Sequence, residues 1–313
     1  MTLTTQKSLY TRLPGRYLRI DDSQVEIPVC TPEFRKSNGS YLKKRGLHLL
    51  NRFLQKGCFE TVGSPWLPGF WVMDESESLA LARNEELRPN SLNLIITSEP
   101  VEGANWHSFL GEPLMLLENN WTTFEDYAGA MKKKYRQRLR KAMALGDSLE
   151  KKWLNTEDYK ECAALLEHTL MDKVVVLPED LEELLQRFKA MFGDAFRVQG
   201  FYREGVLMAF ISTISDGSIL RAMHYGARED ALEHTYSFAM FSVIERGITQ
   251  GYRTINLGRT ATEIKSTYGA VPSSNYFSFY TRNMFFKSIL RVAALRYTPK
   301  KFELRSPFKE GEV

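Results

Sequence analysis

The chain has 313 residues, of which 43% are hydrophobic, 26% charged and 12% aromatic, a composition that excludes extended disorder and fits one large or two ordinary domains. A net charge of +4 is too small to indicate a nucleic-acid binder by itself. The cysteines Cys30, Cys58 and Cys162 are scattered without metal-ligand spacing, so neither a disulfide framework nor a zinc site is predicted.

No apolar segment is long enough to suggest export or membrane insertion. Residues 1–16 contain no run of signal-peptide length, and no stretch approaches the roughly 20 apolar residues that span a bilayer. The cysteine usage fits a reducing compartment. We therefore expect a cytoplasmic protein.

Residues 1–120 predict a mixed α/β domain. A basic helix is expected over 41–55, and strand patterns lie at 17–20, 25–29, 59–62, 70–73, 92–97 and 113–117. Two interpretations stay open for four tryptophans, core packing, which is favoured, or the lining of a pocket: Trp66, Trp71, Trp106 and Trp121. No chemical motif occurs here.

One long helix is predicted over 123–145, opened by a capping box of Thr122 and Glu125. One stripe of this helix is apolar and should pack, namely Met131, Tyr135, Leu139 and Met143. The remaining faces carry seven cations, namely Lys132, Lys133, Lys134, Arg136, Arg138, Arg140 and Lys141. Two interpretations stay open: a solvated helix face, or a docking surface for an acidic carrier protein, phosphates, anionic lipid or tRNA.

The second half predicts a clear order of elements. A strand at 149–154 precedes two helices at 156–171 and 178–192. A three-stranded meander follows at 197–202, 206–214 and 218–225. The order continues with a helix at 234–249, a strand that ends at Gly258, a short helix that ends at Gly269 and a last strand at 275–280.

The strand-to-helix junction after residue 254 is the most informative stretch. Gly258 allows a sharp strand exit, and Thr260 and Glu263 have the spacing of a capping box. Open α/β folds bind ligands where a strand's carboxyl end meets a helix start. Arg259 and Lys265 lie at this junction and are therefore candidate site residues.

Four local motifs accompany this order: Tyr135-Arg136-x-x-x-Arg140-Lys141-Ala142, Gly226-Ala227, Glu245-Arg246-Gly247-Ile248-Thr249-Gln250-Gly251-Tyr252, and Leu257-Gly258-Arg259-x-x-x-Glu263-x-Lys265-x-x-x-Gly269. With them, residues 122–282 resemble the GNAT acyltransferase superfamily, and more narrowly the branch of Fem-type peptidoglycan aminoacyltransferases and related acyltransferase domains. The resemblance implies an α/β (α+β) fold with a GNAT-like mixed sheet, and the length suits two tandem GNAT-like halves with the first degenerate. The expected domains are 1–120, mixed α/β; 121–282, acyltransferase; and 283–313, a basic amphipathic segment.

The resemblance implies acyl transfer from a thioester to an amine, with the donor between two splayed strands at 218–225 and 252–258. Lys265 matches the branch's lysine and is the first catalytic candidate. Arg259 is a candidate anion ligand, His224 a candidate proton acceptor, and Glu263 either a base or a helix cap. For each, an ordinary surface or packing role is the alternative. The donor-binding candidates are Tyr225, Gly226, Thr235, Tyr236 and Ser237, of which the last three open a helix whose N–H groups suit a pyrophosphate. No metal is expected.

The usual GNAT phosphate turn, Q/R-x-x-G-x-G/A, is absent, because residues 226–237 contain one glycine. The donor therefore stays open between acyl-CoA and acyl carrier protein, with aminoacyl-tRNA less favoured. We expect an N-acyltransferase acting on a small-molecule or lipid-like amine, or on one derived from an amino acid. The alternatives are a tRNA-dependent Fem-type aminoacyltransferase in cell-wall precursor synthesis and a non-catalytic GNAT-fold binding module.

A basic amphipathic helix is predicted over 284–295. Six cations and no acid lie between Arg282 and Lys301. Such a helix either lies on an anionic membrane surface or docks on the protein's own core. The first alternative would make the protein peripheral at the inner face of the membrane.

Overall fold

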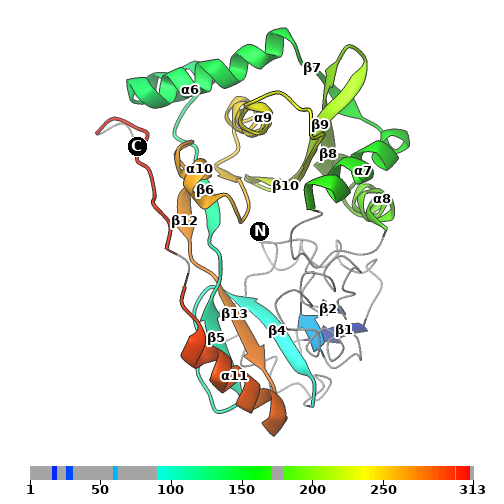
Figure 1. Ribbon diagram of the computed structural model, residues 1–313, viewed down its shortest axis with the longest axis vertical. Helices are drawn as coiled ribbons and strands as arrows, with labels where there is room; N and C mark the ends of the chain where they lie inside the picture. The colour runs from blue at the N-terminus through cyan, green and yellow to red at the C-terminus, as the bar shows by residue number, and fades with distance from the viewer. Residues whose placement is uncertain are drawn as a thin grey trace. The chain divides into compact units, whose positions relative to one another are not determined.

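The structure is a computed structural model that describes residues 16–19, 26–30, 59–62, 90–170, 180–299 and 301–310. The helix predicted at 41–55, the strand predicted at 70–73, and Trp66 and Trp71 lie outside these residues. The chain divides into two compact units: residues 1–113, 172–179 and 274–301 form the first, and residues 114–171, 180–273 and 302–313 the second. Each unit has its own β-sheet (Figure 1).

The first unit contains a six-stranded sheet with the order β1-β2-β3-β4-β13-β5. Its strands are β1 (Arg16–Arg19), β2 (Glu26–Cys30), β3 (Phe59–Val62), β4 (Leu92–Thr97), β5 (Trp106–Leu110) and β13 (Tyr276–Tyr280). β13 pairs antiparallel with both β4 and β5. This last strand was expected within the acyltransferase domain at 121–282, but both of its partner strands lie in the first unit. Helix α11 (Met284–Arg296) packs on β5.

The second unit contains a seven-stranded sheet with the order β12-β6-β11-β10-β9-β8-β7. Its strands are β6 (Leu114–Glu118), β7 (Glu150–Leu154), β8 (Phe196–Arg203), β9 (Val206–Asp216), β10 (Ile219–Ala227), β11 (Thr254–Asn256) and β12 (Val271–Ser273). The predicted meander β8-β9-β10 is confirmed. β6 was expected in the N-terminal domain, but it pairs antiparallel with β11 and β12 of the second unit.

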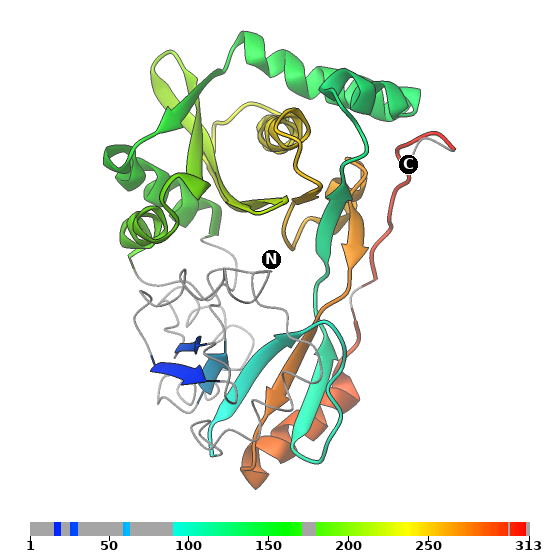
Figure 2. The same ribbon diagram turned by 180° about the vertical axis from the view of Figure 1, so that it is seen from behind.

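Helices cover both faces of the second sheet. They are α5 (Phe124–Ala130), α6 (Lys133–Met143), α7 (Tyr159–Leu170), α8 (Leu181–Phe192), α9 (Thr235–Thr249) and α10 (Thr262–Ser266), with 3₁₀ turns at Ala144–Asp147, Thr156–Asp158 and Gly193–Ala195. α9 packs its buried Phe238 and Ile244 into a cluster with Leu220 of β10, and α5 and α6 pack on α9 (Figure 2). α7 and α8 cover the other face of β10, where Phe188 stacks on His224.

The predicted long helix is broken at Met131 and Lys132, which separate α5 from α6. At this break the chain pairs with residues near the C-terminus: the Lys132 N–H donates to the Pro307 carbonyl at 2.8 Å, and the Lys309 N–H donates to the Ala130 carbonyl at 3.1 Å. These long-range hydrogen bonds replace the helical ones. The predicted capping box of Thr122 and Glu125 is displaced by one residue, to Thr123 and Asp126.

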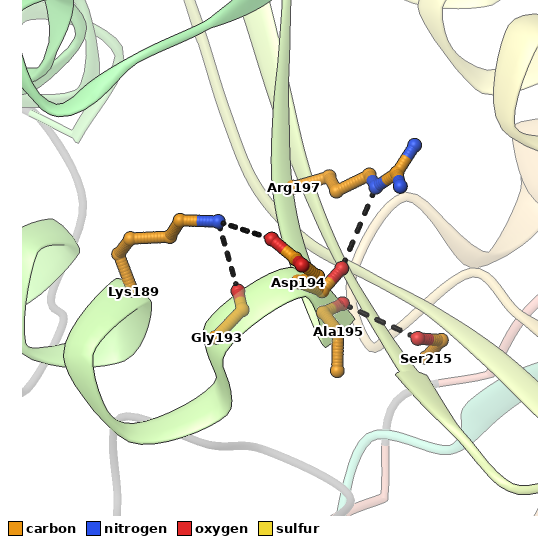
Figure 3. Close-up of polar contacts among 6 residues, drawn as sticks. All are labelled: Lys189, Gly193, Asp194, Ala195, Arg197 and Ser215. Atoms are coloured by element: carbon orange, nitrogen blue, oxygen red, sulfur yellow. Dashed lines mark hydrogen bonds and ion pairs between the residues drawn. The ribbon is translucent and has the colours of Figure 1, made fainter.

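Polar contacts fix the end of α8 against the meander (Figure 3). The Lys189 ammonium donates to the Gly193 carbonyl at 3.0 Å and pairs with the Asp194 carboxylate at 3.2 Å. The Ser215 hydroxyl of β9 contacts the Ala195 carbonyl at 3.4 Å. α8 is thereby held on the face of the sheet that contains His224. Across the described part of the chain, no helix is long and apolar enough to cross a membrane.

Candidate active site

Two neighbouring parallel strands separate in the second unit, as a bound donor between them would require. β10 pairs with β11 only through residues Ile219–Arg221 and Thr254–Asn256. β11 then ends, while β10 continues to Ala227 along β9. The chain leaves β11 through Gly258, whose φ of 78° is in the left-handed region. The region between Ala222–Ala227 of β10 and the exit of β11 is called the wedge.

Asn256 and Gly258 shape the exit of β11. The buried Asn256 side chain accepts a hydrogen bond from the Gly258 N–H at 2.8 Å, while the Gly258 carbonyl accepts the Met115 N–H of β6 at 3.1 Å. A Cβ at Gly258 would lie 3.5 Å from the Ala222 carbonyl oxygen of β10. Gly258 therefore lies close to β10 just beyond the last paired residues of the two strands, at the apex of the wedge.

Lys265 places its ammonium beside this apex. The side chain is only 3% exposed, and Nζ donates a hydrogen bond to the Arg259 carbonyl at 2.6 Å. Nζ also lies 3.9 Å from the position of a Cβ at Gly258. Lys265 therefore holds the loop after β11 and places its positive charge beside the apex of the wedge. Lys265 and Arg259 are thus brought together by the fold, although the contact uses the backbone of Arg259.

The helix that carries Lys265 does not begin with the predicted capping box. α10 starts at Thr262, and the two preceding residues, Thr260 and Ala261, have positive φ values of 64° and 47°. The N-cap position is occupied by Ala261, which makes no side-chain hydrogen bond, so Thr260 does not cap the helix. Glu263 is exposed, and its carboxylate accepts the Glu303 N–H at 3.2 Å. Glu263 is therefore directed at the C-terminal segment.

That C-terminal segment supports α10. The sequence did not predict this contact. The Arg305 N–H donates to the Ser266 hydroxyl at 2.9 Å. Phe308 is buried with its ring 4.9 Å from that of Trp121, and a Cβ at Gly269 would lie 2.1 Å from a Phe308 ring carbon. Gly269 therefore ends the short helix and also leaves room for this ring.

His224 lies on the opposite face of β10 from α9. A bulge between Ala222 and Tyr225 changes the alternation, so that Ala222 and Tyr225 both face the α9 cluster, while His224 stacks 5.5 Å from the Phe188 ring. The Ser212 hydroxyl accepts the His224 N–H at 3.0 Å and contacts Nδ1 at 3.1 Å. Burial lowers the pKa of His224 to about 4, which makes the imidazole a weak base.

A cluster of hydroxyl groups lies between β10, α9 and the end of α10. The Tyr225 and Tyr236 rings meet edge-on at 5.0 Å, and the Tyr268 and Ser237 hydroxyls are 2.8 Å apart. Burial raises the pKa of Tyr268 to about 12 and also raises the pKa values of Tyr225 and Tyr236. These phenols therefore stay protonated at neutral pH and are weaker acids than exposed tyrosines. Tyr268 was not a predicted site residue, and only its position one residue before Gly269 hinted at it.

The other donor-binding candidates lie at the start of α9 and on β10. The Thr235 hydroxyl donates to the Leu232 carbonyl at 2.6 Å, so it closes the preceding turn. His234 precedes the helix in the left-handed region and makes no side-chain cap bond. Gly226 lies against α7, where a Cβ would be 2.7 Å from the Leu166 backbone nitrogen. The fold requires this glycine for packing.

The cationic surface of α6 is exposed. Six of the seven cations from Lys132 to Lys141 are exposed and Arg136 is half-buried, whereas Leu139 and Ala142 pack in the α9 cluster. In the part of the chain that the structure describes, none of these cations forms an ion pair with an acidic side chain. Among the same described residues, no group of three or more His, Cys, Asp or Glu side chains could hold a metal ion.

Residues 129–266 match the profile of the acetyltransferase (GNAT) domain family. No curated protein matches the sequence.

Similar solved structures include L-PGS from Bacillus licheniformis, with 14% identity, 77% of this chain and 83% of that chain covered, and a TM-score of 0.49. A second is the C-terminal domain (DUF2156) of a protein named as a lysylphosphatidylglycerol synthetase, from Agrobacterium fabrum. It is 13% identical, the match covers 76% of this chain and 81% of that chain, and the TM-score is 0.45. FemX is 10% identical, the match covers 58% of this chain and 64% of that chain, and the TM-score is 0.46.

The family match confirms the predicted resemblance and the mixed-sheet fold class. Residues 129–266 therefore match a GNAT domain, and this match supports a transferase.

Proposed function

We propose that the chain is an N-acyltransferase that moves an acyl group from a thioester to an amine at the wedge. The observation that carries the proposal is the separation of β10 from β11 with the Lys265 ammonium beside its apex. A thioester's pantetheine arm is narrow and polar along its length, so it suits a gap between two strand edges. The match to the GNAT family favours catalysis over a role as a binding module.

In the proposed reaction, the amine nitrogen attacks the thioester carbonyl carbon, the C–N bond forms, and the C–S bond breaks. Lys265 stabilises the negative charge that develops on the carbonyl oxygen. The amine proton leaves to water or to a base, and a phenol of the hydroxyl cluster protonates the departing thiolate. Tyr268 is the proposed donor because its hydroxyl belongs to this cluster, 2.8 Å from that of Ser237, although burial raises its pKa and so weakens it as an acid.

The donor is proposed to be carried by acyl-CoA or by an acidic acyl carrier protein, and α6 is the proposed carrier docking surface. Its outward face is cationic and has no exposed large hydrophobic residue. Such a surface attracts a partner by charge alone. A transfer RNA offers similar charge, so aminoacyl transfer from tRNA is the competing function. The acceptor is proposed to be a small or lipid-like amine, used at the cytoplasmic face of a membrane.

The transfer is tested with purified protein, acyl-CoA or acyl carrier protein, and a panel of amines, with thiol release as the signal. Lys265→Met should lower kcat at least tenfold with a smaller change in KM, because the lost charge acts mainly on the transition state. Lys152→Met, at an exposed position on β7, is the matched control. Unchanged turnover in folded Lys265→Met protein would remove Lys265 from the mechanism.

The donor is tested by binding. Neutralising Lys133, Lys134 and Arg138 to glutamine should weaken binding of acyl carrier protein about 10- to 100-fold if each exposed contact contributes up to about 1 kcal/mol. Retention of tRNA with no affinity for the carrier would instead support the aminoacyl function.

A further inference from the structure

Helix α11 of the first unit has two apolar faces, of which one is packed. Phe286 and Leu290 are buried, and the helix lies on β5. Beyond the helix, the Tyr297 ring meets the Phe109 ring edge-on at 5.3 Å, and its hydroxyl donates to the Leu110 carbonyl. α11 is thus attached to the sheet along one side and at its C-terminal end.

The second apolar face is exposed. It consists of Met284 (64% exposed), Phe285 (53%), Ile289 (40%), Val292 (51%) and Leu295 (87%). At about 100° per residue, these five side chains fall within an arc of about 140°, along a helix about 20 Å long. They therefore form one stripe, named the outer stripe, in which the exposed Ser288 is the polar member. An exposed apolar surface of this kind marks an interaction site.

Charge identifies the partner. Lys287 and Arg291 border the outer stripe on one side, and Arg296 lies at its C-terminal end. The sequence contains no Asp or Glu from Ile264 to Phe302. A second copy of the same helix would bring these cations together, which disfavours self-association. An anionic lipid surface complements both features, because acyl chains accept the stripe while headgroups neutralise the flanking cations.

We propose that α11 is an interfacial helix that docks the protein on an anionic lipid surface, with the outer stripe at the boundary between headgroups and acyl chains. Tyr297, at the end of α11, is 42% exposed and is an amphipathic side chain of the kind found at this depth. The proposal goes beyond acyl transfer and does not rest on it. It would bring a lipid-like acceptor and the enzyme to the same surface.

Vesicle sedimentation with the full chain tests the proposal, using phosphatidylcholine vesicles with and without phosphatidylglycerol. The wild-type protein should bind only the anionic vesicles, and added salt should weaken binding. Replacing Ile289 and Val292 with serine should reduce vesicle affinity at least about tenfold, since each substitution removes on the order of 1 kcal/mol of apolar burial. Val206→Ser, an apolar residue that is 45% exposed at the start of β9, is the matched control and should bind as wild type.

A triple variant, Lys287→Gln, Arg291→Gln and Arg296→Gln, tests the role of the cations. It should bind anionic vesicles about 100-fold more weakly, because each cation contributes about 1 kcal/mol. Arg291 and Arg296 are exposed and Lys287 is half-buried, so circular dichroism of the triple variant checks that it remains folded. Three results would each overturn the proposal. They are equal binding to neutral vesicles, loss of binding only when α6 is neutralised, and a dimer that dissociates on Ile289→Ser and Val292→Ser. Lys265→Met should retain vesicle binding, which separates failure of this proposal from failure of the proposed reaction.

Discussion

Replacing His224 with asparagine should remove an acid-sensitive part of the stability. In the folded protein the pKa of His224 is lowered to about 4 by burial, whereas the unfolded chain has the ordinary value of about 6.5. Between these values the unfolded state binds more protons, so stability falls as the pH decreases from about 6.5 to about 4. The difference of about 2.5 pKa units corresponds to about 3 kcal/mol in full, of which about 2 kcal/mol is lost between about pH 7 and pH 5.

Urea unfolding followed by tryptophan fluorescence at about pH 7 and pH 5 measures this contribution. Asparagine can keep the hydrogen bond to the Ser212 hydroxyl but leaves a gap beside Phe188, so His224→Asn should be less stable than wild type at both pH values. Its loss of stability between the two pH values should be about 2 kcal/mol smaller. His168→Asn removes an exposed histidine of α7 as a control. Equal acid sensitivity of His224→Asn and wild type would refute the argument.

Two packing predictions follow from close approaches. Gly226→Ala should destabilise the protein by about 1–3 kcal/mol, because its Cβ would lie 2.5 Å from the Phe210 ring and 2.7 Å from the Leu166 nitrogen. Gly129→Ala, whose Cβ would have nothing within 4 Å, is the control in thermal unfolding. Equal melting temperatures of the two variants would contradict the prediction. Phe308→Ala should cost about 3–5 kcal/mol and lower transfer activity in the protein that remains folded, because the C-terminal segment supports α10. Full activity in that variant would separate the segment from the site.

Local sequence signals predicted the central meander well. The turns that join its strands contain Gly205 and Gly217, which adopt positive φ values of 81° and 56°. Each strand pairs with its neighbour in sequence, so the information is local. The helices α7, α8 and α9 were predicted within a few residues for the same reason, since their apolar periodicity matches the face that packs.

The failures involve partners that are distant in sequence. β13 joins the first sheet and β6 the second because each finds its hydrogen-bonding edges there, which no local pattern encodes. The break between α5 and α6 depends on hydrogen bonds to residues about 175 positions later, at Pro307 and Lys309. Two adjacent threonines made the capping position ambiguous, and tertiary packing selected Thr123.

The candidate site was predicted in part. The junction after β11 does bring Lys265 to the exit of the strand, and its residues were identified by motif spacing. The direction of each side chain was not predictable, since it depends on the bulge in β10 for His224 and on the left-handed residues before α10 for Glu263. The contribution of Tyr268 emerged only from its contact with Ser237 on α9.

The most direct test of the central claim is amide hydrogen exchange of the wild-type chain with and without coenzyme A. The pantetheine arm is common to acyl-CoA and acyl carrier protein, so one probe serves both proposed donors. We expect slower exchange in peptides that cover Ala222–Ala227 of β10 and the β11 exit from Asn256 to Gly258, with no change in the first unit's sheet. Unchanged exchange in both wedge segments at millimolar coenzyme A would contradict the account.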